Sequence, residues 1–197
     1  MSDNFVYLAS ASPRRSALLE QIGVAHVVRV AEIDETAGPD EPPARYVTRL
    51  ANAKAEAVWA EVAPVPVIAA DTAVVLDGRI LGKPGSEAEA LAMLEALSGR
   101  IHRVFTSVAV RSRSGIEAAL NVSEVRFRAT TDEERRAYCA TGEPFDKAGG
   151  YGIQGIGAVF VEHLSGSYSG VMGLPLCETA QLLERAGVQG GWSKGRA

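Results

Sequence analysis

The fold is decided by residues 65–78, which read Val-Pro-Val-Ile-Ala-Ala-Asp-Thr-Ala-Val-Val-Leu-Asp-Gly. Two apolar runs flank the polar pair Asp71-Thr72, and they predict one buried strand up to residue 70 and a further strand up to residue 76. Asp77-Gly78 is a hairpin turn signal, so the chain is expected to return antiparallel after it. A buried strand beside an antiparallel return is typical of a mixed sheet rather than a purely parallel one.

Helices and strands alternate on both sides of this stretch. Apolar residues spaced by three and four predict a helix over residues 43–62. Ser12 is a favourable N-cap for an earlier helix, and Ser86 with Glu89 and Thr131 with Glu134 form the pattern of capping boxes for two later ones. The other elements are expected at residues 5–9, 24–30, 101–111, 116–128, 158–164 and 175–186.

This order of elements predicts a single α/β domain over residues 1–189, built on a mixed twisted sheet with flanking helices. The residues at 190–197 are Gly-rich and are expected to form a loose tail. Of the 197 residues, 47% are hydrophobic and 22% are charged. That composition supplies enough apolar surface for a core, so disorder as the main state is excluded.

The net charge and the hydropathy of the chain limit the kinds of partner that we expect. The net charge of −4 argues against a broad surface for nucleic acid. The longest apolar run, at residues 62–70, is too short to cross a membrane, and the first residues lack the plan of a secretory signal, so a cytoplasmic protein without membrane or nucleic-acid partners is expected. Cys139 and Cys177 lie far apart and are expected to be reduced, buried thiols.

Arg14 and Arg15 are unusual because they fall in the first turn of the helix that follows Ser12. Cations at that end oppose the helix dipole, whereas an anion bound there would be favoured by the free N–H groups, the dipole and both guanidinium groups. Two solvated arginines on an exposed turn would give the same sequence. The motif therefore leaves an anion site and a plain surface turn open.

Lys54 lies in the apolar stripe of the helix predicted at 43–62. A lysine in that stripe either extends to solvent along its apolar stem or points into a polar cleft. Asp71 follows an apolar run directly, which suits a catalytic carboxylate at the C-terminal end of a buried strand and equally an ordinary turn residue. Both positions are candidates on their residue type and placement alone.

The residues at 149–157 are dense in glycine, which permits close approach of the backbone to a ligand. The stretch lacks P-loop spacing, the three histidines lack the spacing of a zinc site, and no serine-hydrolase elbow is present. What remains is a set of carboxylates, Glu35 and Asp71 with Asp146 as a further candidate, and a set of cations. The cations are Arg14, Arg15, Lys54, Lys83 and Lys147. Carboxylates bind Mg²⁺ or Mn²⁺ and cations bind phosphate, so the combination suits metal-assisted cleavage of a polyphosphate.

Seven blocks carry a resemblance to a known family. They are Ser10-Ala11-Ser12-Pro13-Arg14-Arg15 with Leu18-Leu19, Ile33-Asp34-Glu35, Ala53-Lys54-Ala55, Ala70-Asp71-Thr72, Gly82-Lys83-Pro84, Asp146-Lys147-Ala148-Gly149 with Tyr151-Gly152-Ile153-Gln154-Gly155, and Gly173-Leu174-Pro175-Leu176. In this order they resemble the Maf family of nucleotide pyrophosphatases over about residues 8–187. The resemblance implies a Maf/inosine-triphosphatase-like α/β fold with two lobes around a central cleft. It also implies hydrolysis of a nucleoside triphosphate to a monophosphate and pyrophosphate with a divalent cation, Mg²⁺ or Mn²⁺, and it leaves a homodimer open.

The resemblance also implies roles for individual residues. Asp71 looks like the proton acceptor that readies the attacking water, and Glu35 is similar to the family's metal-associated carboxylate, so that these two would hold the metal. The other matched positions are Lys54 and Lys83 as catalytic residues and Ser10, Arg14, Arg15, Thr72, Lys147 and Gln154 as substrate-binding residues.

Two further accounts stay open at this point. Thr72 after Asp71 and the pair Ile153-Gln154 look like the family branch that acts on dTTP and UTP, and the same chemistry on 7-methyl-GTP is the alternative. A nucleotide-binding regulator of septum formation, acting without turnover, would need the basic residues but not the carboxylates.

Overall fold

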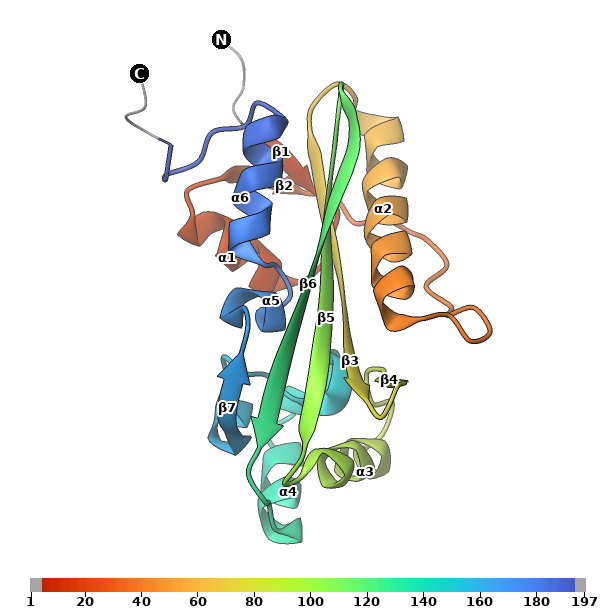
Figure 1. Cartoon of the computed structure of the whole chain (residues 1–197), viewed down its shortest axis with the longest axis vertical. Helices are drawn as coiled ribbons and strands as arrows, with labels where there is room; N and C mark the ends of the chain where they lie inside the picture. The colour runs from red at the N-terminus through yellow and green to blue at the C-terminus, as the bar shows by residue number, and fades with distance from the viewer. Residues whose placement is uncertain (1–4, 194–197) are drawn as a thin grey trace. The chain divides into compact units, whose positions relative to one another are not determined.

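Seven strands form one mixed sheet among the described residues, 5–193, of the computed structural model (Figure 1). The order is β2-β1-β3-β5-β6-β7, and β4 pairs with β3. The pairings of β1 with β2 and with β3 are parallel, whereas β4 on β3 and β7 on β6 are antiparallel. The strands are β1 (Phe5–Leu8), β2 (Ala25–Val28), β3 (Val67–Leu76), β4 (Arg79–Leu81), β5 (Ile101–Ser112), β6 (Gly115–Phe127) and β7 (Val161–Ser165).

Six α-helices and three short 3₁₀ helices complete the described part of the chain. The α-helices are α1 (Pro13–Gln21), α2 (Pro43–Val62), α3 (Glu87–Leu97), α4 (Asp132–Cys139), α5 (Tyr168–Met172) and α6 (Leu176–Arg185). The 3₁₀ helices are η1 (Glu143–Asp146), η2 (Ala148–Gly150) and η3 (Ile156–Phe160). Within residues 5–193, none of the helices combines the length and the apolar character that crossing a bilayer requires.

The chain divides into two compact units. Unit 1 comprises the described parts of Met1–Asp71, Thr106–Asn121 and Gly173–Ala197, and unit 2 comprises Thr72–Phe105 and Val122–Met172. The long strands β3, β5 and β6 each contribute residues to both units.

In unit 1, α2 packs on the sheet through small side chains. Ala51, Ala55 and Val58 of α2 share one cluster with Val67 and Ala69 of β3. Small residues let the helix approach the strand closely, and their spacing of three and four keeps one face of α2 against the sheet. Figure 1 shows α1 and α6 on the side of the unit 1 strands opposite to α2.

In unit 2, α3 and α4 pack together around an aromatic core. Phe127 is 1% exposed and makes edge-on contacts with the rings of His102 and Tyr151. The helices start where the sequence predicts. The Ser86 side chain accepts from the Glu89 N–H, and Thr131 and Glu134 form a complete capping box.

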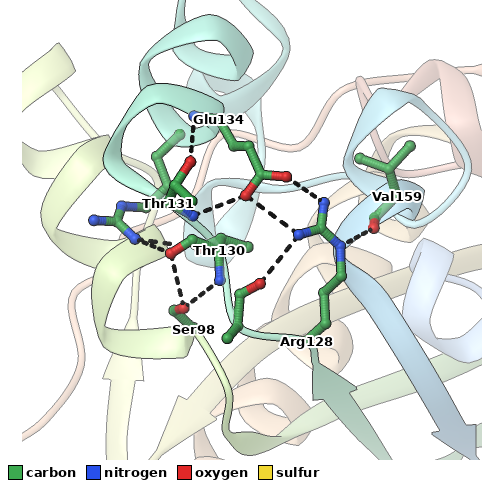
Figure 2. A network of polar contacts seen from close by, with 8 residues as sticks. Ser98, Arg128, Thr130, Thr131, Glu134 and Val159 are labelled. Atoms are coloured by element: carbon green, nitrogen blue, oxygen red, sulfur yellow. Dashed lines mark hydrogen bonds and ion pairs between the residues drawn. The ribbon is translucent and has the colours of Figure 1, made fainter.

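The start of α4 is also tied to a neighbouring segment (Figure 2). Glu134 accepts a hydrogen bond from the Thr131 N–H at 2.8 Å and one from Arg128 at 2.8 Å, and Arg128 also donates to the Val159 carbonyl at 2.9 Å. One guanidinium group therefore joins the end of β6, the N-terminus of α4 and η3 within unit 2.

The mixed sheet, the flanking helices and the bounds of the helix at residues 43–62 confirm the predictions from sequence. Three expectations are wrong in detail. Asp71 and Thr72 do not separate two strands, because β3 runs through them. The strand expected from residue 158 begins at Val161, because η3 comes first. Cys139 and Cys177 are both free, as expected, but Cys177 is exposed.

The single domain over residues 1–189 stays a prediction, as does a cleft between two lobes. Residues 190–193 of the predicted tail are described, and there the Gly191 N–H donates to the Ile22 carbonyl at 2.8 Å. Residues 194–197 lie outside the described part of the chain.

Candidate active site

Lys54 lies between two carboxylates in unit 1. Its Nζ is 2.7 Å from Asp71 Oδ1, to which it donates a hydrogen bond, and 2.7 Å from Glu35 Oε1. Lys54 is 8% exposed and Asp71 is 7% exposed. A buried ammonium is costly unless it is paired, and here two carboxylates pair it. The sequence left open whether Lys54 extends to solvent or points to polar groups, and the structure shows that it points to polar groups.

The local sequence explains why these side chains meet. Side chains alternate between the two faces of a strand, so Asp71 shares a face with Val67 and Ala69, which pack against α2. Lys54 belongs to the buried stripe of α2, next to Ala51 and Ala55. The small apolar residues that pack α2 on β3 are therefore followed, on the same two faces, by the ion pair between Lys54 and Asp71.

Burial raises the pKa of the Asp71 carboxyl, and the ion pair with Lys54 opposes that rise. A carboxylate with a raised pKa is a better proton acceptor than an exposed aspartate. Glu35 differs in that its side chain is 56% exposed. Asp71 is thus a buried, more basic carboxylate, and Glu35 is an accessible one.

Ser10 and Arg15 form a second group in unit 1, at the start of α1. Arg15 donates from Nη1 to Ser10 Oγ at 3.0 Å and from Nε to the Gly173 carbonyl at 2.9 Å. Burial lowers the pKa of Arg15, and the negative charge of Asp71 opposes that effect while the charge of Arg14 adds to it. Ser12 is at the N-cap, but its side chain makes no cap hydrogen bond within the described residues. Positive side chains and a helix N-terminus thus lie together, an arrangement suited to an anion.

The other predicted residues lie in unit 2. Thr72 is half-buried in β3, and Lys83 is exposed just after β4. Lys147 donates from Nζ to Asp146 Oδ1 at 2.5 Å and to the Glu143 carbonyl at 2.8 Å. Gln154 is exposed within the glycine-rich segment. That the residues of the two units act in one site stays a prediction.

Sequence reasoning missed Glu143, which holds the segment that carries Gln154. Its carboxylate accepts from the Ile156 N–H at 2.8 Å, the Gly157 N–H at 3.1 Å and the Tyr138 hydroxyl at 2.8 Å. Burial acts to raise the pKa of Glu143, but these hydrogen bonds hold it below its ordinary value. A glutamate just before a glycine-rich stretch was the available signal, since closely spaced glycines expose N–H groups for a carboxylate to accept.

The donor set fits a hard divalent cation. Among residues 5–193 no group of three or more His, Cys, Asp or Glu side chains could hold a metal by itself. Mg²⁺ commonly takes only one or two carboxylates and completes its shell with water and substrate phosphates. Glu35 and Asp71 already contact one cation, the Lys54 ammonium, so these two carboxylates fit that mode of binding.

A model of the Maf-like protein family matches residues 5–186 of the chain. The chain belongs to the Maf family. All the predicted site residues of this Maf chain lie inside the matched range.

Named relatives of this Maf protein match it over nearly its whole length. A protein from Methylobacillus flagellatus named dTTP/UTP pyrophosphatase is 54% identical over 185 residues, which cover 93% of both chains. Proteins of the same name from Pasteurella multocida and Aromatoleum aromaticum are 49% and 51% identical. Those two alignments cover 96% and 92% of this chain and 99% and 95% of the relatives.

Proposed function

We propose that this Maf protein hydrolyses dTTP and UTP to the nucleoside monophosphate and pyrophosphate, with a divalent metal ion. The relatives' names support the substrates. The observation that carries the chemistry is the contact of the buried Lys54 with Asp71 and Glu35, because an anion-binding protein without turnover has no need of two carboxylates beside its cations. We further propose that it acts in the cytoplasm.

In this proposal Asp71 accepts the proton of the attacking water. Its buried position raises its pKa and so favours proton uptake. Lys54 holds the Asp71 carboxylate in place through the 2.7 Å hydrogen bond and balances its charge. Ser10, Arg14 and Arg15 bind phosphate oxygens at the N-terminus of α1, where the backbone N–H groups add to the attraction.

Glu35 and Asp71 would hold the metal ion. Bound there, Mg²⁺ or Mn²⁺ would neutralise phosphate charge and lower the pKa of a coordinated water. Lys83 and Lys147 of unit 2 are assigned to the substrate's phosphates, since ammonium groups stabilise the charge that develops on phosphoryl oxygens. Thr72 and Gln154 are assigned to the pyrimidine base, whose acceptor and donor edge an amide and a hydroxyl can match.

The Asp71→Asn variant tests the role of the base. The amide keeps the shape of the side chain but cannot accept the proton, so turnover should fall at least about 100-fold while the fold is retained. Pyrophosphate release from dTTP with Mn²⁺ measures this, and circular dichroism checks the fold. The matched control is Asp77→Asn, which changes an exposed aspartate paired with Arg100 and should leave turnover unchanged. Substantial activity in Asp71→Asn would refute the assignment.

A panel of triphosphates tests the substrate. Pyrophosphate release should be fastest with dTTP and UTP and slower with 7-methyl-GTP and with purine triphosphates. Faster release from 7-methyl-GTP would move the protein to the other branch of the family. Nucleotide binding without any release would favour a regulator that works without turnover.

A further inference from the structure

Glu35 lies in a segment that has no helix or strand of its own. Residues 29–42 connect β2 to α2 without regular structure. The Glu35 side chain is 56% exposed, yet its carboxylate contacts Lys54 at 2.7 Å. An exposed side chain on an irregular segment keeps such a position only if the backbone beneath it is held.

Two residues of α2 hold that backbone. The Tyr46 hydroxyl donates to the Glu35 carbonyl at 3.1 Å, and Arg49 donates from Nη2 to the Thr36 carbonyl, also at 3.1 Å. These are consecutive carbonyls, and the two donors lie three residues apart on one face of the helix. The same helix carries Lys54, so α2 contacts Glu35 through the backbone on one side and through the carboxylate on the other.

Arg49 is itself fixed in place by Glu41. Its Nε and Nη2 donate to Glu41 Oε1 and Oε2 at 2.8 and 2.7 Å, and Glu41 also accepts from the Gly38 N–H at 3.0 Å. The hydrogen bonds from Arg49 and Gly38 lower the pKa of Glu41 to about 2. The guanidinium group lies over the Tyr46 ring, 5.7 Å from its centre. A forked pair of this kind fixes the orientation of the arginine, which a single contact would not.

We propose that Arg49, together with Tyr46 and Glu41, is a positioning residue that holds Glu35 where it shares a cation site with Asp71. This inference rests on the proposed function, since it assigns a support to the proposed metal carboxylate. Within residues 5–193, Arg49 forms no hydrogen bond or ion pair with Asp71 or Lys54. Its effect on the reaction therefore passes through the backbone of residues 35 and 36.

The test compares Arg49→Ala with Arg45→Ala, which removes an exposed arginine one turn earlier on the same helix. Isothermal titration of the nucleotide-free protein with Mn²⁺ should show affinity about tenfold weaker in Arg49→Ala, since partners that orient a ligand are typically worth that much. The Mn²⁺ concentration for half-maximal pyrophosphate release should rise by a similar factor. Arg45→Ala should change neither quantity. Arg49→Lys should fall between, because an ammonium cannot reproduce the fork.

A double-mutant cycle separates positioning from direct binding. In a Glu35→Gln background, Arg49→Ala should change Mn²⁺ affinity by less than about twofold, because the carboxylate that it positions is already gone. If Arg49→Ala weakened Mn²⁺ affinity in that background as much as it does in the wild type, the proposal would be overturned. Unchanged Mn²⁺ affinity in Arg49→Ala would also overturn it. Tyr46→Phe removes only the hydroxyl and serves if Arg49→Ala fails to fold. It should weaken Mn²⁺ affinity in the same direction, and unchanged affinity there would also count against the proposal.

Failure of the proposed function would look different. Wild-type protein that releases no pyrophosphate from dTTP or UTP would remove the proposed activity. The titrations with Mn²⁺ would still report whether Arg49 supports Glu35.

Discussion

Lys54 joins a buried carboxylate to an exposed one, so its charge matters to both stability and chemistry. The sequence alone marked Lys54 as unusual, because a lysine interrupts an apolar stripe of the predicted helix. Its partners were not visible, since Glu35 and Asp71 come from a loop and a strand that only the folded chain brings to α2. Sequence thus identified the anomalous residue, and packing decided between solvent and a polar contact.

Replacing Lys54 by Met should cost stability as well as activity. The change leaves Asp71 buried without its ion pair, and breaking a buried pair from one side costs about 3–5 kcal/mol. Urea unfolding with and without the substitution measures this. The control is Arg29→Met, which removes an exposed ion pair with Glu61 and should change stability little.

Both members of the ion pair between Lys54 and Asp71 can also be replaced together. Lys54→Met combined with Asp71→Asn should recover part of the lost stability, because no unpaired buried charge is left. Equal stability losses in Lys54→Met and Arg29→Met would contradict this account of Lys54.

At the scale of elements, the sequence was most reliable where one local rule acts alone. Helix α2 was predicted to its ends, because its apolar spacing and the proline at its start agree. Strand β3 was divided in two, because Asp71 and Thr72 resemble a break in an apolar run. Asp71 is tolerated inside the strand because α2 supplies Lys54 on the face to which the Asp71 side chain points. Local patterns cannot show a partner that comes from another element.

The glycine-rich segment allows a test at this scale. A Cβ added at Gly155 would lie 2.5 Å from both carboxylate oxygens of Glu143, so Gly155→Ala should displace the hydrogen bonds that hold the segment with Gln154. Small misplacements of binding groups are costly, and KM for UTP should rise about tenfold or more. Gly85→Ala is the control, because its Cβ would meet Glu89 at an ordinary 3.4 Å.

Glu143→Ala checks the cause of that effect. It removes both the hydrogen bonds and the group that the new methyl would strike, so the double variant should be no worse than Glu143→Ala alone. Additive increases in KM would show that Gly155 is required for another reason.

At the scale of the whole molecule, we expect stability at acid pH to depend on a buried histidine that has no role in the proposed chemistry. His102 is 2% exposed, and a 2.8 Å hydrogen bond joins its Nε2 to the Tyr151 hydroxyl. Its Nδ1 has no hydrogen-bond partner among the described residues. Burial lowers the pKa of His102 to about 4, so the ring is neutral in the folded protein at neutral pH.

The sign of the pH dependence follows from this shift. An unfolded histidine has a pKa near 6.5, so between about pH 4 and 6.5 the unfolded chain binds a proton that folded His102 does not bind. The stability that depends on the protonation of His102 is therefore present in full above about pH 6.5. As the pH falls toward 4, the unfolding free energy decreases progressively, by about 3 kcal/mol in total. In His102→Gln, whose amide can still reach Tyr151, the decrease in unfolding free energy from pH 7 to pH 4 should be smaller by about that amount. Urea unfolding at several pH values measures it, with His163→Gln on exposed β7 as the control. If His102→Gln and the wild type lose stability in parallel on acidification, the buried ring is not the group that makes the fold acid-sensitive.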